Sequence, residues 1–264
     1  MIWLAGYLLL GAVAGFFAGL LGVGGGAIMV PVLALMFTAQ GFPEGHLMHL
    51  ALGTSMAAIV FTSISSLRAH HAHGAVRWPI VKTITPGILL GTFAGAQLAS
   101  LIPTRPLAIF FTAFMSYVAF QMLANIKPKP SRQLPGSFGM FLVGGGIGAI
   151  SALVAIGGGS LSVPFMTWCN VKMHEAIGTS AAIGFPIALA GTAGYLVGGW
   201  SASGLPAWSF GYVYLPALAT CVAASWLTAP FGAKAAHRLP VATLKKIFAG
   251  VILLLLAKML HGLF

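Results

Sequence analysis

Long apolar runs separated by short polar connections cover most of the chain. A membrane-spanning helix needs about 20 predominantly apolar residues, and eight runs approach or exceed that length. They occupy residues 2–21, 48–67, 79–101, 106–124, 137–156, 174–199, 208–230 and 241–261. The pattern therefore predicts an all-α polytopic membrane protein with about eight full spans.

Two further apolar runs are too short to cross a bilayer. As helices, residues 27–39 and 160–171 would extend about 20 Å and about 18 Å, whereas the hydrocarbon core is about 30 Å thick. Each run follows a glycine-rich break, at 22–26 and at 157–159. We therefore expect a short helix after each glycine-rich break.

The two halves of the chain carry similar motifs in the same order. The matching pairs are Gly24 with Gly157, Pro31 with Pro164, His49 with His174, Gly53-Thr54-Ser55 with Gly178-Thr179-Ser180, and Gly95 with Gly232. The repetition predicts a duplication, with residues 1–124 as the first transmembrane repeat and 137–264 as the second. Residues 125–136, which are rich in proline and basic residues, would form the linker between them.

The composition agrees with this class and excludes others. Hydrophobic residues make up 59% of the 264 residues and charged residues 6%, whereas a soluble domain carries roughly 25% charged residues. The chain has 13 Lys and Arg residues against two Asp and Glu, and a formal net charge of +11. Because no solvated face is available to carry these cations, they do not indicate nucleic-acid binding.

The positions of the cations depend on whether each broken helix pair returns to the side where it started. If it does, each half makes an odd number of passes and the two repeats are inverted. Eleven of the 13 cations then share one side: Arg68, Arg77, Lys82, Lys127, Lys129, Arg132, Lys172, Lys234, Arg238, Lys245 and Lys246. The positive-inside rule favours this arrangement over parallel halves. It predicts cytoplasmic loops 68–82, 125–136 and 233–246, and both chain ends in the periplasm.

The glycine-rich breaks are the main candidate for a binding site. In transporters built from inverted repeats, substrates bind where the interrupted helices approach each other. Helix starts after the breaks would offer free N–H groups and positive dipole ends, which suit an anion. The predicted anion site consists of Gly24, Gly25, Gly26, Ala27, Gly157, Gly158, Gly159 and Ser160. Close helix packing is the alternative role for glycines in this chain.

Hydroxyl groups and histidines near the starts of the next long helices are further candidates. Thr54, Ser55, Thr179 and Ser180 could donate hydrogen bonds to an oxyanion, or could cap a helix or bond a backbone carbonyl. The matched residues His49 and His174 could titrate or gate transport, or could simply lie at interfacial helix starts.

Metal or acid–base chemistry is poorly supported by the sequence. His70, His71 and His73 cluster in one segment, but no carboxylate or thiol accompanies them to complete a metal site. Glu44 and Glu175 lie at segment ends, so no span carries an acid near its centre. We therefore expect no catalytic residues, metal or cofactor, which disfavours an intramembrane enzyme.

Taken together, the motifs resemble those of a known family. The segments Gly24-Gly25-Gly26 and Gly157-Gly158-Gly159, each followed by Val-Pro and later by Gly-Thr-Ser, resemble the sulfite exporter TauE/SafE family of membrane permeases. The resemblance covers nearly the whole chain. It implies transport of sulfite, sulfonates and related anions across the bacterial cytoplasmic (inner) membrane. The second copy has Ala155 where the first has Gly22, so the two halves of the site need not be equal.

These observations predict a secondary transporter that moves a small anion, such as a sulfur oxyanion, by alternating access around the two breaks. An anion channel that uses the same dipole-lined site is the alternative. The expected partners are the anionic substrate and the lipid bilayer, with a homo-oligomer left open. The duplicated breaks disfavour a purely structural or assembly protein.

Overall fold

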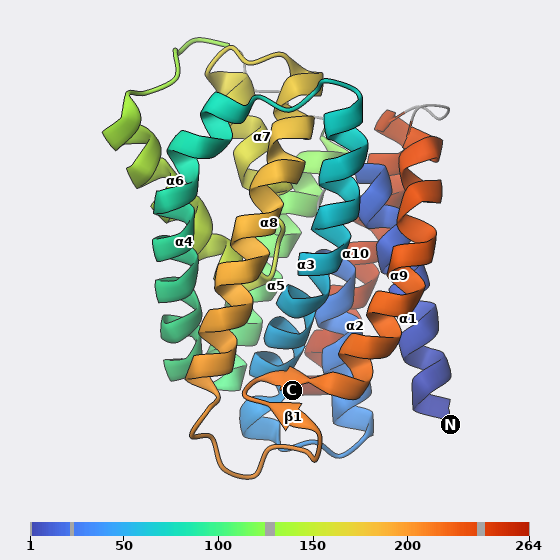
Figure 1. Ribbon diagram of the computed structural model, residues 1–264. Coiled ribbons are helices and arrows are strands. Elements are labelled where there is room, and N and C mark those ends of the chain that lie inside the picture. Colours follow the sequence, from blue (N-terminus) through green and yellow to red (C-terminus); the bar gives the residue numbers. More distant parts are fainter. Residues whose placement is uncertain (1, 22–23, 125–129, 237–240, 264) are drawn as a thin grey trace.

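The computed structural model describes residues 2–21, 24–124, 130–236 and 241–263, which form a helical bundle (Figure 1). Its helices are α1 (Ile2–Leu21), α2 (Gly26–Ala39), α3 (Leu47–Ala72), α4 (Trp78–Leu101), α5 (Thr104–Leu123), α6 (Ser137–Val154), α7 (Gly159–Trp168), α8 (Met173–Gly198), α9 (Leu215–Ala236) and α10 (Val241–Leu263). In the described part of the chain, the 3-10 turn η1 (Glu44–His46) precedes α3, and two short strands, β1 (Ser209–Phe210) and β2 (Val213–Tyr214), precede α9.

The helices confirm the predicted all-α polytopic class. Seven helices of the described part are long and apolar enough to cross a membrane, namely α1, α3, α4, α5, α6, α8 and α9. The two short helices expected after the glycine breaks are α2, with 14 residues, and α7, with 10. Helix α10 occupies the eighth predicted segment, and its role as a full span stays a prediction.

One predicted span begins too early. Helix α9 starts at Leu215 and not at residue 208. The preceding residues form an antiparallel hairpin in which Phe210 pairs with Val213. Trp208 and Gly211 have φ values of 66° and 53°, which a right-handed helix excludes. The hairpin carries apolar side chains, as does the helix that follows it. The hydropathy pattern therefore begins before α9 does.

The bundle has two distinct ends (Figure 1). The hairpin end carries β1, β2 and both marked chain termini, and the linker end carries the teal α3–α4 connection and the start of α6. Arg77, Arg132 and Lys172 lie in connections at the linker end, whereas Arg105 lies in the first turn of α5 at the hairpin end. Of the other predicted markers, Lys127, Lys129 and Arg238 fall outside the described residues. The membrane face that each end occupies stays a prediction.

The two halves of the chain pack extensively against each other. Helix α1 lies along α9, α4 lies along α6, α3 packs against α8, and α5 packs against α10. In the matched sequences, α1 corresponds to α6 and α4 corresponds to α9. If the two halves are exchanged, the α1–α9 pair therefore becomes the α6–α4 pair. Two repeats would produce this correspondence. The duplication and its inversion stay predictions.

Glycines allow the closest helix pairs to form. A Cβ atom added to Gly91 of α4 would collide with the backbone carbonyl of Gly145 in α6. Similarly, a Cβ atom on Gly11 of α1 would collide with the backbone carbonyl of Cys221 in α9. These small residues therefore serve the close approach of helices, as the four-residue spacing of Gly87, Gly91 and Gly95 and of Gly11, Gly15 and Gly19 predicts.

We expect Gly91→Val to destabilise the α4–α6 pair, because the obstructing atoms belong to a backbone that cannot rotate away. Overpacking of this kind costs about 1–3 kcal/mol of folding free energy. The melting temperature in detergent, measured by the loss of monodisperse protein, should fall. The matched control is Gly146→Val on α6, where no atom lies within 4 Å of an added Cβ. Equal melting temperatures for the two variants would contradict the packing role.

Candidate functional site

The two glycine-rich breaks contact each other inside the bundle. A Cβ atom placed on Gly24 would lie 3.1 Å from Cα of Gly157. A Cβ atom placed on Gly26 would overlap the carbonyl oxygen of Ala155. The segments predicted to approach each other from the two halves therefore do so, and their separation leaves no room for side chains at these positions of the first break.

Left-handed backbone turns precede both short helices. Gly25 and Gly158 are the N-cap residues of α2 and α7, with φ values of 77° and 86°. Glycine adopts such angles at little cost because it has no Cβ atom. Ala155, at the end of α6, has φ of 45°, a conformation that costs an ordinary residue roughly 1–2 kcal/mol. Its counterpart, Gly22, lies outside the described residues.

Two helix N-termini converge where the breaks meet. Helix α2 lies in the half of the bundle toward the hairpin end and α7 in the half toward the linker end (Figure 1). The N–H groups of Ile28 and Met29 bond within the first turn of α2, and those of Leu161 and Ser162 bond within the first turn of α7. The N–H groups before them have no partner within their helices, as at any helix start. The breaks therefore bring together two positive dipole ends.

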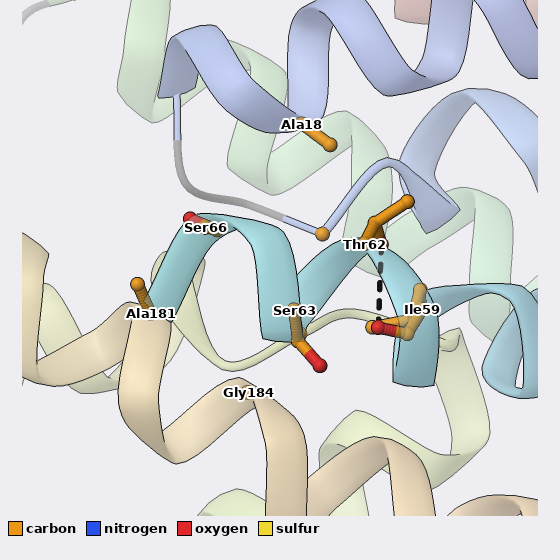
Figure 2. Close-up of a pocket in the computed structure, with 9 residues that line it drawn as sticks. Ala18, Ile59, Thr62, Ser63, Ser66, Ala181 and Gly184 are labelled. Carbon is orange, nitrogen blue, oxygen red and sulfur yellow. Dashed lines mark hydrogen bonds between the residues drawn. The ribbon is translucent and has the colours of Figure 1, made fainter. Parts of the chain in front are cut away.

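A small cavity adjoins this contact (Figure 2). Its volume is about 10 Å³, which is room for about one water molecule. Its wall is formed by Ala18, Gly24, Ile59, Thr62, Ser63, Ser66, Gly157, Ala181 and Gly184. None of these side chains is ionisable. The side-chain polarity of the wall thus comes from three hydroxyl groups on α3.

The three hydroxyl groups differ in their hydrogen bonds. Thr62 Oγ1 donates to the carbonyl of Ile59 at 3.2 Å, and Ser63 Oγ donates to the carbonyl of Val60 at 2.9 Å. Both bonds stay within α3, one turn back along the helix. Ser66 Oγ is buried and has no hydrogen-bond partner. One of the three donors is therefore available without breaking an existing bond.

Gly24 and Gly157 are the predicted site residues that line the cavity. Ala27 and Gly159 are buried in the first turns of α2 and α7, and Ser160 is half-buried beside Gly159. The breaks therefore reach the cavity through their first glycines, while the remaining predicted residues form the helix starts behind them.

The predicted threonines hold connections in place and do not line the cavity. Thr54 Oγ1 accepts a hydrogen bond from the N–H group of Tyr214 at 2.9 Å, just before α9. Thr179 Oγ1 accepts one from the N–H group of Arg77 at 3.0 Å, just before α4. Arg77 Nε also pairs with Glu175 Oε2 at 3.0 Å. Both hydroxyls therefore bond backbone N–H groups, and not the carbonyls that the structural alternative named. Their role toward an anion stays a prediction.

Replacing either threonine by valine should destabilise the protein without weakening anion binding. Thr54→Val and Thr179→Val each leave a backbone N–H group without its acceptor, which costs about 1–3 kcal/mol when the group is buried. A fall in melting temperature at unchanged substrate affinity would measure this. Thr92→Val is the matched control, because Thr92 is fully buried and its Oγ1 has no partner to lose. Weaker substrate binding by the Thr54 and Thr179 variants would instead place these hydroxyls at the site.

The predicted serines Ser55 and Ser180 also lie away from the cavity wall. Ser162 Oγ lies 2.9 Å from Ser180 Oγ and 2.8 Å from the carbonyl of Gly158, so these hydroxyls tie α7 to α8. Ser55 Oγ is buried without a hydrogen-bond partner. The matched serines therefore have different environments in the two halves.

The matched histidines do not reach the cavity. His49 is 3% exposed, and its Nε2 lies 3.1 Å from the carbonyl oxygen of Ala99 and 3.0 Å from that of Ile102. Its ring stacks on Tyr212, with centroids 4.9 Å apart, and burial raises the pKa of the Tyr212 hydroxyl. The cavity-lining part of α3 starts ten residues after His49, about 15 Å along the helix. His174 is exposed at the start of α8.

The sequence analysis missed Thr62, Ser63 and Ser66. The sequence does contain a signal for them: Thr62 and Ser63 lie four and three residues before Ser66, and residues at these spacings share one face of a helix. Polar side chains in a spanning helix also tend to face the protein interior. Among the described residues, no group of three or more His, Cys, Asp or Glu side chains is placed to hold a metal ion.

Comparisons with known proteins find relatives along nearly the whole chain. The model of a family described as sulfite exporter TauE/SafE matches residues 7–259. A probable membrane transporter protein of Haemophilus influenzae is 39% identical over 92% of each chain. The probable membrane transporter proteins YdhB and YunE of Bacillus subtilis are 27% and 24% identical, over 73% and 97% of this chain and 77% and 97% of theirs. No solved structure matches.

Proposed function

The chain belongs to the sulfite exporter TauE/SafE family and is a multi-pass membrane transporter, and we propose that it carries a small anion such as sulfite, a sulfonate or a related sulfur oxyanion. The substrate would bind where the two glycine-rich breaks meet. The observation that carries this proposal is the contact between Gly24 and Gly157 beside a cavity without ionisable side chains.

The electrostatics of the breaks support an anion as the substrate. Helix N-termini attract negative charge through their free N–H groups and aligned peptide dipoles. The two starts belong to helices of different halves and point toward a common region. The described residues that line the cavity include no carboxylate to repel an anion.

The same arrangement suits alternating access. Each half of the chain contributes one break, so relative movement of the halves would open the cavity first toward one end of the bundle and then toward the other. Transporters built from inverted repeats work in this way, with the substrate near the repeat interface. An anion channel with the same site remains the competing function.

We also propose that the linker end faces the cytoplasm of a bacterial cell and that both termini lie in the periplasm. The basic connections at that end follow the positive-inside rule. Cysteines introduced by Ser131→Cys and Lys234→Cys should react with a membrane-impermeant maleimide from the cytoplasmic side, and one introduced by Gly204→Cys from the periplasmic side. A control without added cysteines tests for reaction of Cys169 and Cys221, which are buried. Labelling of residues 131 and 234 from opposite sides would contradict this arrangement.

Transport by purified protein in liposomes tests the function. We expect uptake of sulfite or methanesulfonate and accelerated counterflow when the same anion is loaded inside, with little acetate uptake. Accelerated counterflow indicates a carrier, whereas single-channel currents without counterflow would indicate a channel. Absence of flux for every oxyanion would contradict both, and empty liposomes provide the background.

A further inference from the structure

Two equivalent contacts, one at each end of the bundle, join the halves of the chain, and their role rests on the proposed function. We propose that they are the two gates of the transport cycle, which separate in turn to open the cavity toward one end and then toward the other. The linker-end contact consists of Ala75, Arg77, Gly178 and Thr179. The hairpin-end contact consists of Tyr212, Tyr214, Gly53 and Thr54.

The two connecting segments share one sequence pattern. Gly-x-Val-x-x-Pro occurs at residues 74–79, which lead into α4, and again at 211–216, which lead into α9. The two copies have the same separation as Gly95 and Gly232. Both copies begin with a left-handed turn, since φ is 67° at Gly74 and 53° at Gly211, which glycine adopts at little cost. The pattern is therefore a further matched motif of the two halves.

The linker-end contact crosses from the first half to the second. The N–H group of Ala75 donates to the carbonyl of His70 at the end of α3, at 3.1 Å. Its own carbonyl lies against α8, since a Cβ atom added to Gly178 would be 2.6 Å from this oxygen. Two residues later, the N–H group of Arg77 donates to Thr179 Oγ1 at 3.0 Å. The end of α3 is thereby joined to the start of α8.

The hairpin-end contact repeats these bonds from the second half to the first. The N–H group of Tyr212 donates to the carbonyl of Tyr195 near the end of α8, at 3.2 Å. Its own carbonyl lies against α3, where a Cβ atom added to Gly53 would overlap it. Two residues later, the N–H group of Tyr214 donates to Thr54 Oγ1 at 2.9 Å. The end of α8 is thereby joined to the start of α3.

The cavity lies between the two contacts. Helices α3 and α8 pack together and run in opposite directions (Figure 1). Along α3, the hairpin-end contact at 53–54 precedes the cavity-lining residues between 59 and 66, and along α8, the linker-end contact at 178–179 precedes those between 181 and 184. With both contacts formed, the cavity has room for about one water molecule. A larger substrate therefore needs one contact to separate before it enters.

The threonine bonds are the strongest part of each contact that a substitution can remove. Thr54 and Thr179 are fully buried, so loss of either hydroxyl leaves a backbone N–H group without its acceptor. The linker-end contact also includes the ion pair of Arg77 with Glu175, whose side chains are 51% and 20% exposed. Ion pairs with this exposure contribute little. We therefore expect the threonines, and not the ion pair, to determine how readily each end opens.

A cysteine in the cavity measures which end is open. Ser63→Cys replaces a buried, cavity-lining hydroxyl by a thiol of similar shape. A membrane-impermeant thiol reagent is applied to right-side-out and to inside-out membrane vesicles containing the full chain. In this background Thr54→Val should raise the labelling rate from the hairpin end about tenfold, and Thr179→Val should do so from the linker end, as expected for one lost hydrogen bond. The parent chain, whose Cys169 and Cys221 are buried, provides the background rate.

Matched variants separate gating from general loosening. Thr54→Ser and Thr179→Ser keep the acceptor oxygen and should restore the low rate. Thr92→Val removes a buried hydroxyl that has no partner and should leave the rate unchanged. Glu175→Gln should raise labelling from the linker end by about twofold at most.

The side from which labelling rises decides the inference. Faster labelling from opposite sides in the two valine variants would support the gates. Unchanged labelling, or a rise from the same side or from both sides in each variant, would overturn them. Because labelling needs no substrate, opposite-sided labelling of a protein that carries no anion in liposomes would keep the gates and overturn the proposed substrate instead.

Discussion

Gly26→Ala should reduce anion transport by about a hundredfold while the protein still inserts into the membrane. Gly26 lies in the first turn of α2, where alanine is a better helix former than glycine. The added methyl group would nevertheless overlap the carbonyl oxygen of Ala155 and lie 3.0 Å from Cδ1 of Ile59. The second break would have to move away, and displacements of about 1 Å in a binding site cost about a hundredfold in rate.

Initial uptake of labelled methanesulfonate by proteoliposomes, at matched amounts of monodisperse protein, measures this loss. Gly250→Ala is the matched control, because Gly250 lies in α10 and no atom is within 4 Å of its missing Cβ. We expect wild-type uptake for this control. Wild-type uptake by Gly26→Ala would show that transport does not depend on the contact between the breaks.

The hydropathy of the chain predicts most of the helices because lipid and protein interior both favour long apolar segments. It fails at the start of α9, where Phe210, Val213 and Tyr214 continue the apolar pattern through a hairpin. Hydropathy alone does not distinguish a buried turn from a helix. Trp208, which is 76% exposed, has a positive φ that its hydropathy does not reveal.

The sequence predicted only those candidate site residues that have a match in the other half of the chain. Consecutive glycines identified both breaks, and the matched Gly-Thr-Ser motifs directed attention to Thr54 and Thr179, which support the connections before α9 and α4. The cavity hydroxyls have no such match. At the equivalent positions of the second half, where Thr62, Ser63 and Ser66 stand in the first, the sequence has Ile187, Ala188 and Gly191. Repetition thus identified the scaffold, whereas the polar groups of the cavity belong to one half alone.

Gly158→Val should likewise reduce transport by about a hundredfold, because it changes the turn that directs the start of α7. Gly158 is the N-cap of α7 with φ of 86°, and a β-branched residue in this conformation is strained by about 1–3 kcal/mol. Its Cβ would lie 2.8 Å from Cδ1 of Ile187, which can rotate away, so the backbone angle dominates. A shift of this angle would redirect the free N–H groups of α7 away from the cavity. We expect uptake to fall about a hundredfold.

Gly158→Val could lower transport either by straining the backbone in general or by disturbing the site. Gly204→Val is the control that distinguishes these two effects. Gly204 has a similar φ of 75° and no atom within 4 Å of its missing Cβ, and it lies in the connection between α8 and the hairpin. Valine there introduces a comparable backbone strain far from the breaks. We expect the two variants to lose similar stability, as melting temperatures would record, while Gly158→Val alone loses uptake. Equal loss of uptake in both would mean that general destabilisation, and not the orientation of the α7 start, explains the defect. Ala155, at the end of α6, already has a positive φ, so the second break accepts a strained non-glycine residue at that position. We expect Gly158, at the start of α7, to be the position of this break where glycine is required.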